Sequence, residues 1–187
     1  MTAISEPEGA LPGTGVAAGG TSVAGPGSDT GARVVEFLIW PRNLLAVVGV
    51  FLGFWFLFAG DPASAVTWVC LLAVGGVGLV AYVSHVVFAR ADARRLGFGD
   101  KPSGFQYEVG FFNLAVAVVA ILAVALGWGV KAQAALCLVY GAYFLQCAGL
   151  FVVRVGREEG GRRFIKNVII FLVLGGFLLA FGIIGLV

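Results

Sequence analysis

The side chains that could do chemistry in this chain are a few polar groups set inside long apolar segments. His85 and Glu108 each lie about one turn from the end of such a segment, and the amides of Asn113 and Gln146 lie about 10 Å deep in theirs. Ionisable groups are costly to bury in hydrocarbon, so they usually face the interior of a helix bundle and pair there. We predict a polar vestibule with His85–Glu108 and Asn113–Gln146 as pairs. Its candidate residues are His85, Gln106, Glu108, Asn113, Tyr143 and Gln146.

A purely structural role for the same residues stays open. His85, Gln106 and Glu108 could reach water from the membrane interface. Asn113 and Gln146 could join helices by hydrogen bonds worth about 0.6 kcal/mol each. Helical geometry also divides the group, because Glu108 and Asn113 lie about 140° apart on a helix while Gln106 and Asn113 share a face. Only some of these residues can therefore line one cavity.

The sequence lacks the motifs that common enzymes and metal sites use. His85 is the only histidine, so no histidine pair can ligate haem, and no Walker sequence, GxSxG or HExxH motif occurs. Cys70, Cys137 and Cys147 stand in apolar runs without CxxC or Cys/His spacing. We expect no catalytic residue, no metal site and no cofactor, and we predict that the protein is not an enzyme.

The elements that must position the polar groups are predicted to be five transmembrane helices. The chain has 187 residues, of which 60% are hydrophobic and 12% charged, whereas a soluble domain carries roughly 25% charged residues. A helix crosses the bilayer with about 20 apolar residues. Five segments qualify: residues 40–60, 65–89, 105–128, 132–153 and 164–187.

This pattern predicts an all-α fold, an integral membrane helical bundle over residues 33–187. Residues 1–32, rich in Gly, Ala, Ser and Pro, are predicted to form a disordered tail. The first helix is expected to open at Trp40, with Pro41 in its first turn. A four-helix alternative would place some basic clusters on the wrong side of the membrane. The 29 glycines, many of them inside spans, predict closely packed helices and a candidate face for self-association.

Basic residues orient the bundle in the membrane. Of twelve Lys and Arg residues, eleven fall in the stretches 33–42, 90–101 and 154–166, which five helices place on one side. By the positive-inside rule, that side and the N-terminus are cytoplasmic. We therefore expect a multi-pass protein of the cytoplasmic (plasma) membrane. The basic residues are spread over loops and form no surface of the kind that binds nucleic acid, so no nucleic-acid partner is predicted.

The last basic stretch is a candidate contact for anionic lipids. Each basic residue near an anionic membrane surface contributes roughly 1 kcal/mol, although Glu158 and Glu159 weaken the patch. The predicted contacts are Arg154, Arg157, Arg162, Arg163 and Lys166.

Two motifs resemble those of a family of small prokaryotic multi-pass membrane proteins of unknown function. A Gln-x-Glu-x-Gly-x-x-Asn pattern opens one helix, and a Gly/Ala-rich aromatic helix over residues 140–149 follows it. The family often has a histidine after the second motif, where this chain has Leu150. The resemblance covers about half of the chain and implies a helical membrane fold in a prokaryote, with no assigned activity. The residues that fit the first motif are Gln106, Glu108, Gly110 and Asn113.

Two functions remain open from the sequence. The first is a non-enzymatic accessory or scaffold subunit that acts through helix packing, with the lipid bilayer and either itself or another membrane subunit as partners. The alternative is a small oligomeric transporter or channel that uses the cytoplasm-facing vestibule. The outer half of the apolar segments has almost no polar side chains, and no repeat relates the two halves of the chain. Both observations favour the first hypothesis.

Overall fold

The described part of the chain is helical. The computed structural model describes residues 27–96, 101, 103–157 and 164–187, and no strand occurs in these ranges. Its helices confirm the prediction of a five-helix membrane bundle. Those long and apolar enough to cross a membrane are Thr30–Phe58, Pro62–Val87, Gly104–Ala125, Val130–Arg157 and Ile165–Ile184. Residues 1–26 of the predicted tail lie outside the described ranges.

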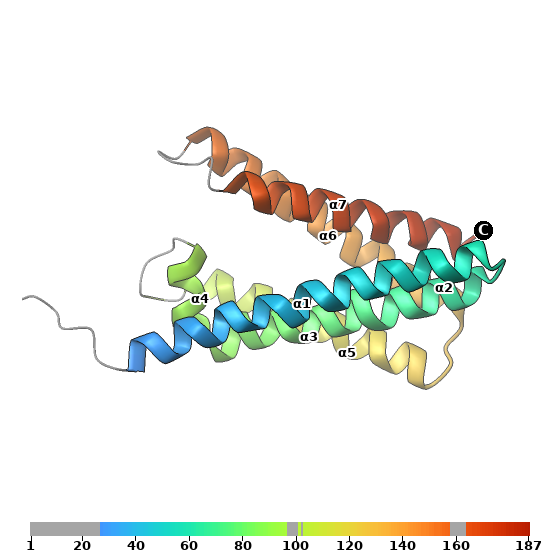
Figure 1. Ribbon diagram of the computed structural model, residues 1–187, viewed down its shortest axis with the longest axis horizontal. Helices are drawn as coiled ribbons and strands as arrows, with labels where there is room; N and C mark the ends of the chain where they lie inside the picture. The colour runs from blue at the N-terminus through green and yellow to red at the C-terminus, as the bar shows by residue number, and fades with distance from the viewer. Residues whose placement is uncertain (1–26, 97–100, 102, 158–163) are drawn as a thin grey trace, which may run out of the picture.

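The second span is less regular than its composition predicts. It consists of α2 and α3 joined and followed by the π-helical segments η1 (Val69–Gly76) and η2 (Val83–Val87). Such wide turns are frequent at functional sites. The α-helices in chain order are α1 (Gly27–Phe58), α2 (Pro62–Trp68), α3 (Val77–Tyr82), α4 (Ala89–Leu96), α5 (Gly104–Ala125), α6 (Val130–Arg157) and α7 (Ile165–Ile184), as Figure 1 shows.

The first helix begins earlier than the sequence predicts. The predicted start at Trp40 is wrong, because α1 runs from Gly27 and carries Pro41 in its interior. The end of the predicted tail is therefore helical. Packing against α4 accounts for the extension, since a Cβ atom placed on Gly31 would lie 3.5 Å from the Cβ of Ala91. The part of α1 that precedes the apolar run thus has a tertiary contact of its own.

The helices form two groups that meet at one end and diverge at the other (Figure 1). α1, the second span and α5 pack together, and α6 and α7 form an antiparallel pair. We call the end with the C-terminus the far end. There α7 meets α1, because the Phe54 ring centroid lies 5.5 Å from that of Phe177 and 5.3 Å from that of Phe181. At the opposite end, called the basic end after the arginines of α4, the α6–α7 pair stands away from α1.

α6 and α7 pack closely because two glycines face each other. A Cβ atom on Gly141 would lie 3.0 Å from the Gly175 carbonyl oxygen, and one on Gly175 would lie 3.1 Å from the Gly141 carbonyl oxygen. These distances leave no room for a side chain at the crossing point. The close helix packing that the glycine content predicts is confirmed at this pair.

Two tight turns close the far end of the bundle. Gly127 and Gly129, with φ angles of 62° and 91°, reverse the chain between α5 and α6. Asp61 caps α2 by accepting a hydrogen bond from the Ser64 backbone N–H at 3.0 Å. Hydrogen bonding from Ser64 lowers the pKa of the Asp61 carboxyl. These turns fix where the spans end at the far end of the bundle. The helices separate at the opposite, basic end.

Candidate functional site

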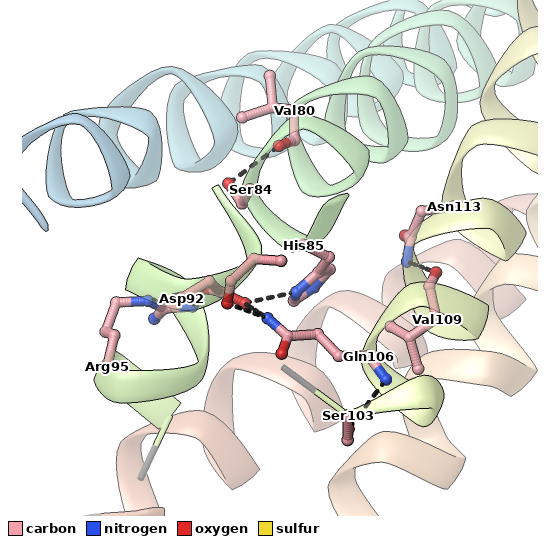
Figure 2. Close-up of polar contacts among 10 residues, drawn as sticks. Val80, Ser84, His85, Asp92, Arg95, Ser103, Gln106, Val109 and Asn113 are labelled. Carbon is pink, nitrogen blue, oxygen red and sulfur yellow. Dashed lines mark hydrogen bonds and ion pairs between the residues drawn. The ribbon is translucent and has the colours of Figure 1, made fainter. Parts of the chain in front are cut away.

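A buried carboxylate, Asp92, organises the polar groups at the basic end (Figure 2). Its side chain is 0% exposed. The His85 Nδ1 atom lies 2.6 Å from Asp92 Oδ2. Arg95 donates to Asp92 Oδ1 from Nη2 at 2.6 Å and from Nε at 3.0 Å. Gln106 Nε2 donates to Oδ2 at 3.3 Å. Residues from the second span, α4 and α5 therefore meet on one carboxylate.

The local backbone brings Asp92 back to His85. The π-helical segment η2 ends at Val87, and the φ of −106° and ψ of 32° at Phe88 turn the chain out of the span. α4 starts at the next residue, and its Asp92 N–H donates to the Phe88 carbonyl at 3.0 Å. Gln106 also binds this turn, because its Nε2 donates to the Ala89 carbonyl at 2.9 Å. The turn and α5 thus hold α4 against the end of the second span.

The charge of Asp92 is compensated within the cluster. Burial by itself would raise the pKa of the Asp92 carboxyl, which lies outside the membrane-spanning segments. The hydrogen bond and charge of His85, followed by those of Arg95, outweigh burial and hold that pKa below its ordinary value. The carboxylate is therefore the stable form near neutral pH. Removing one partner from such a buried group usually costs more than forming the pair gains.

Gln106 retains one buried acceptor without a partner. Its Oε1 atom has no hydrogen bond among the described residues. Rotating the amide by 180° would turn this oxygen toward the Asp92 carboxylate, so the observed orientation is the favourable one. Ser103 caps α5 by accepting from the Gln106 N–H at 3.2 Å, which fixes the backbone from which Gln106 reaches inward.

A second buried pair lies deeper in the bundle. The Tyr140 hydroxyl donates to Asn113 Oδ1 at 2.6 Å, and Asn113 Nδ2 donates to the Val109 carbonyl at 2.7 Å (Figure 2). Tyr140 is 0% exposed and Asn113 is 2% exposed. The pair joins α5 to α6.

Between the two helix groups lies a cleft of about 450 Å³, which we call the α1–α7 cleft. Its lining comes from α1, α3, η2, α5, α6 and α7. The rim residues Val47, Ile169 and Val173 are exposed, so the cleft opens sideways toward the surface that a bilayer would cover. Its polar lining includes Arg42, Asn43, His85, Asn113, Tyr140 and Asn167.

The cleft is polar toward the basic end and apolar toward the far end. On α1, Arg42 and Asn43 are followed by Ala46, Val47 and Val50. On α7, Asn167 is followed by Leu174 and Phe177, and the contact of Phe177 with Phe54 closes the cleft at its far end. The lining of the cleft therefore changes from polar to apolar along the bundle.

The structure divides the residues predicted for the vestibule. His85, Asn113 and Tyr143 line the cleft, and Gln106 lies buried beside Asp92. Glu108 and Gln146 are exposed and border a separate shallow pocket, which Tyr143 also contacts. Both predicted pairs are wrong. His85 binds Asp92, and Asn113 binds Tyr140. The angular separation of Glu108 from Asn113 on α5 explains why Glu108 faces away from the cleft.

Sequence reasoning misses three residues of the candidate site. Asp92 stands in a charged segment that looks like a surface loop, although its spacing of three from Arg95 on an amphipathic helix was a usable signal. Arg42 follows a proline and was counted only toward membrane orientation, yet it lines the cleft. Tyr140 donates to Asn113 from the neighbouring helix, but no pattern in the sequence identifies Asn113 as its partner.

The basic stretch between α6 and α7 is only partly described. Arg157 and Lys166 are exposed, as a contact with anionic lipids requires, whereas Arg162 and Arg163 lie outside the described residues. Arg154 is partly engaged by the protein. Its guanidinium lies 4.2 Å from the centroid of the Phe164 ring, and its Nη1 donates to the Leu96 carbonyl at 3.3 Å. The lipid contact of this stretch stays a prediction.

The fold and the cleft define a five-helix membrane protein with an amphipathic lateral cleft. The chain belongs to a family of unknown function (DUF6790), whose model matches residues 44–181. An uncharacterised family agrees with the resemblance seen in the sequence, and the motif that carried that resemblance is not tested by the match. No curated protein and no solved structure matches the chain. Among the described residues, no group of three or more His, Cys, Asp or Glu side chains could hold a metal ion.

Proposed function

We propose that this protein is a non-enzymatic membrane protein that binds an amphiphile in the α1–α7 cleft. The observation that carries the proposal is the cleft itself, with a volume of about 450 Å³, a polar end and an apolar end. The sideways opening lets a molecule enter from the bilayer without crossing water. The sequence-based hypothesis of a protein that acts only through packing does not account for the separation of the α6–α7 pair from α1 at the basic end.

The transport alternative has less support from the described residues. The polar lining stops short of the far end, where Phe54 contacts Phe177 and Phe181. In the far half, Thr67 and Gln133 are hydrogen-bonded to each other, with the Thr67 hydroxyl donating to Gln133 Oε1 at 2.7 Å. No continuous polar path therefore links the two ends within the described part of the bundle. A binding site open to one membrane leaflet fits this lining better than a conduit.

The proposed orientation follows the positive-inside rule. The basic end carries the arginines of α4 and the end of α6, so it faces the cytoplasm of a prokaryotic cell whose plasma membrane holds the protein. The polar end of the cleft then lies near the cytoplasmic leaflet. The head group of a bound amphiphile lies at the level of that leaflet, and its alkyl chain extends toward the middle of the membrane.

Filling the cleft tests this function. The purified protein is incubated in mild detergent with an equal mixture of phosphatidylglycerol and phosphatidylcholine of matched chains, and native mass spectrometry counts the lipids retained. Ala46 lines the cleft, and Ala115 is exposed on α5 outside it. We expect Ala46→Trp to retain one lipid fewer than the parent protein, and the matched control Ala115→Trp to retain the parent number.

Two outcomes would contradict the proposed function. One is that the parent protein retains no lipid under these conditions. The other is that Ala46→Trp and the parent protein retain equal numbers while both remain folded, as judged by their unfolding temperatures. Hydrolysis of either lipid during the incubation would separately contradict the non-enzymatic assignment, and the same spectra would reveal it.

A further inference from the structure

The cleft contains a positive charge that the described protein does not pair. Arg42 lines the cleft and is partly buried. It makes no hydrogen bond or ion pair within the described residues. No acidic side chain is among the described lining residues of the cleft. A guanidinium held in a low-dielectric site without a counter-charge is costly, and such groups commonly mark binding sites for anions.

The nearest carboxylate cannot serve as the missing counter-charge. Arg42 interacts electrostatically with both Asp92 and Arg95, whose charges oppose each other. The oxygens of Asp92 are already bound by His85, Arg95 and Gln106. The charge of Asp92 is thus compensated within its own cluster, and the charge of Arg42 has no counter-charge there.

The depth of Arg42 matches the level of lipid head groups. α1 has 32 residues, which at 1.5 Å per residue span about 48 Å, well beyond the hydrocarbon thickness of about 30 Å. Counting about 30 Å back from Phe58 reaches the neighbourhood of Ile39. Arg42 then lies within about one turn of the hydrocarbon boundary. From Arg42 to the closed end at Phe54, α1 rises about 18 Å, which leaves room for an alkyl chain.

We propose that the ligand of the cleft is a lipid with an anionic head group, a phosphate ester or carboxylate, that is bound by Arg42. This inference rests on the proposed function and adds the class of ligand. The planar guanidinium donates two parallel hydrogen bonds to a phosphate or carboxylate. His85, Asn43 and Asn167 line the same end and supply polar groups beside the head. The alkyl chain occupies the apolar lining between Val50 and Leu174.

This site differs from the general attraction of basic loops for anionic membranes. Arg157 and Lys166 are exposed at the basic end and offer unspecific contacts with any anionic surface. Arg42 lines a cavity with a defined apolar extension, so it selects a head group together with a chain. The two kinds of contact are separable by substitution, because Arg42 can be changed without altering the loops.

The test compares head-group selection in matched variants. Each protein is incubated with the same lipid mixture, and native mass spectrometry counts the two lipids that it retains. The lipid bound in the cleft is the difference between the parent protein and Ala46→Trp, and the measured quantity is the ratio of phosphatidylglycerol to phosphatidylcholine in that difference. We expect the parent protein to prefer phosphatidylglycerol, and Arg42→Gln to lose about tenfold or more of this preference. The control Arg90→Gln removes the same charge from an exposed position at the basic end and should keep the preference.

A second Arg42 variant and an experiment with inorganic phosphate complete the test of the head-group assignment. Arg42→Lys keeps the charge without the planar fork, so it should give an intermediate preference, and it serves as the readout if Arg42→Gln does not fold. Equal retention of both lipids by the parent protein, or an unchanged preference in the folded Arg42 variants, would overturn the head-group assignment. Retention of inorganic phosphate at the cleft, with no lipid retained there, would overturn it as well, because a water-soluble anion would then be the ligand.

The failure of this inference can be told apart from failure of the proposed function. If one lipid is bound without head-group selection and is lost in Ala46→Trp, the cleft binds an amphiphile and the assignment to an anionic head is wrong. If Ala46→Trp loses no lipid, the proposed function itself is wrong, whatever the head groups of the lipids that remain.

Discussion

The His85 Nδ1 atom lies 2.6 Å from Asp92 Oδ2, across the turn that joins the second span to α4. The same histidine lines the α1–α7 cleft. One short contact therefore connects a cleft residue to a helix that packs outside the spans. Because Gln106 of α5 binds both Asp92 and the Ala89 carbonyl, the position of α4 depends on this cluster. Changes at Asp92 should accordingly affect both stability and the cleft.

Asp92→Asn should strongly destabilise the protein. The substitution preserves shape but removes the charge that His85 and Arg95 face, and losing one partner of a buried ionic group costs about 3–5 kcal/mol. The measurement is the free energy of unfolding in a denaturing-detergent titration. Glu36→Gln is the control, because Glu36 is exposed on α1 and its neutralisation should change little. Equal effects of the two substitutions would show that the cluster contributes no stability.

Acid should weaken the protein through Asp92. The pKa of Asp92 is lowered in the folded state, chiefly by His85 and then Arg95 acting against burial. The stability that this carboxylate contributes is therefore present above its unfolded pKa of about 3.9 and is lost as pH falls through the lower folded pKa.

Unfolding measured between neutral pH and about pH 3 should show a loss of stability in the parent protein that is reduced in Asp92→Asn. The difference between the two curves isolates Asp92 from exposed acids such as Glu36 and Glu108. Parallel curves over the whole range would mean that Asp92 has the same pKa in both states, contrary to this prediction.

Tyr140→Phe should destabilise the contact between α5 and α6. The substitution removes the hydroxyl that donates to Asn113 Oδ1 and leaves a buried acceptor without its partner, at a cost of about 1 kcal/mol. Tyr107→Phe is the matched control, because Tyr107 is exposed on α5. A free energy of unfolding for Tyr140→Phe that equals the control would show that this hydrogen bond adds nothing to stability.

Gly141→Ala should separate α6 from α7. The added methyl would lie 3.0 Å from the Gly175 carbonyl oxygen and from the Leu179 backbone nitrogen, so one helix must move, at a cost of about 1–3 kcal/mol. Gly149→Ala on the same helix meets nothing within 4 Å and should be neutral or slightly stabilising, because alanine favours helix. The same unfolding titration compares the two variants. An unchanged free energy of unfolding in Gly141→Ala would contradict the close packing of α6 against α7.

The fold was largely predictable because a membrane restricts the choices. Backbone polar groups inside hydrocarbon must be satisfied within each span, so five long apolar runs imply five helices. The start of α1 was not predictable from its apolar run, since the helix continues beyond that run, where Gly31 packs against Ala91 of α4. The π-helical turns of the second span also leave no mark in composition.

The candidate site was only half predictable for a geometric reason. Depth along a helix follows from counting residues, and it predicts two layers, with His85 near the helix end and Asn113 below it. Pairing depends on the rotation of each helix and on where the chain turns back. The turn at Phe88 brings Asp92 to His85, and the rotation of α6 turns Tyr140 toward Asn113. Neither fact is encoded in spacing along one helix.

Cysteine labelling should report directly on the cleft. Cys147 lines the cleft and is partly exposed, whereas Cys70 and Cys137 are 0% exposed. N-ethylmaleimide, a small membrane-permeant reagent, should therefore modify one thiol of the folded protein and all three after denaturation, as counted by mass spectrometry. Cys147→Ser should abolish labelling of the folded form.

The rate of this labelling should also depend on what fills the cleft. Ala46→Trp places an indole in the cleft that Cys147 lines, so it should slow modification, while Ala115→Trp on the outer face of α5 should leave the rate unchanged. Added phosphatidylglycerol should slow labelling of the parent protein and have a weaker effect on Arg42→Gln. Modification of Cys70 or Cys137 in the folded protein, or equal rates in both tryptophan variants, would mean that the reagent reaches these thiols by local unfolding and that the cleft does not control access to Cys147.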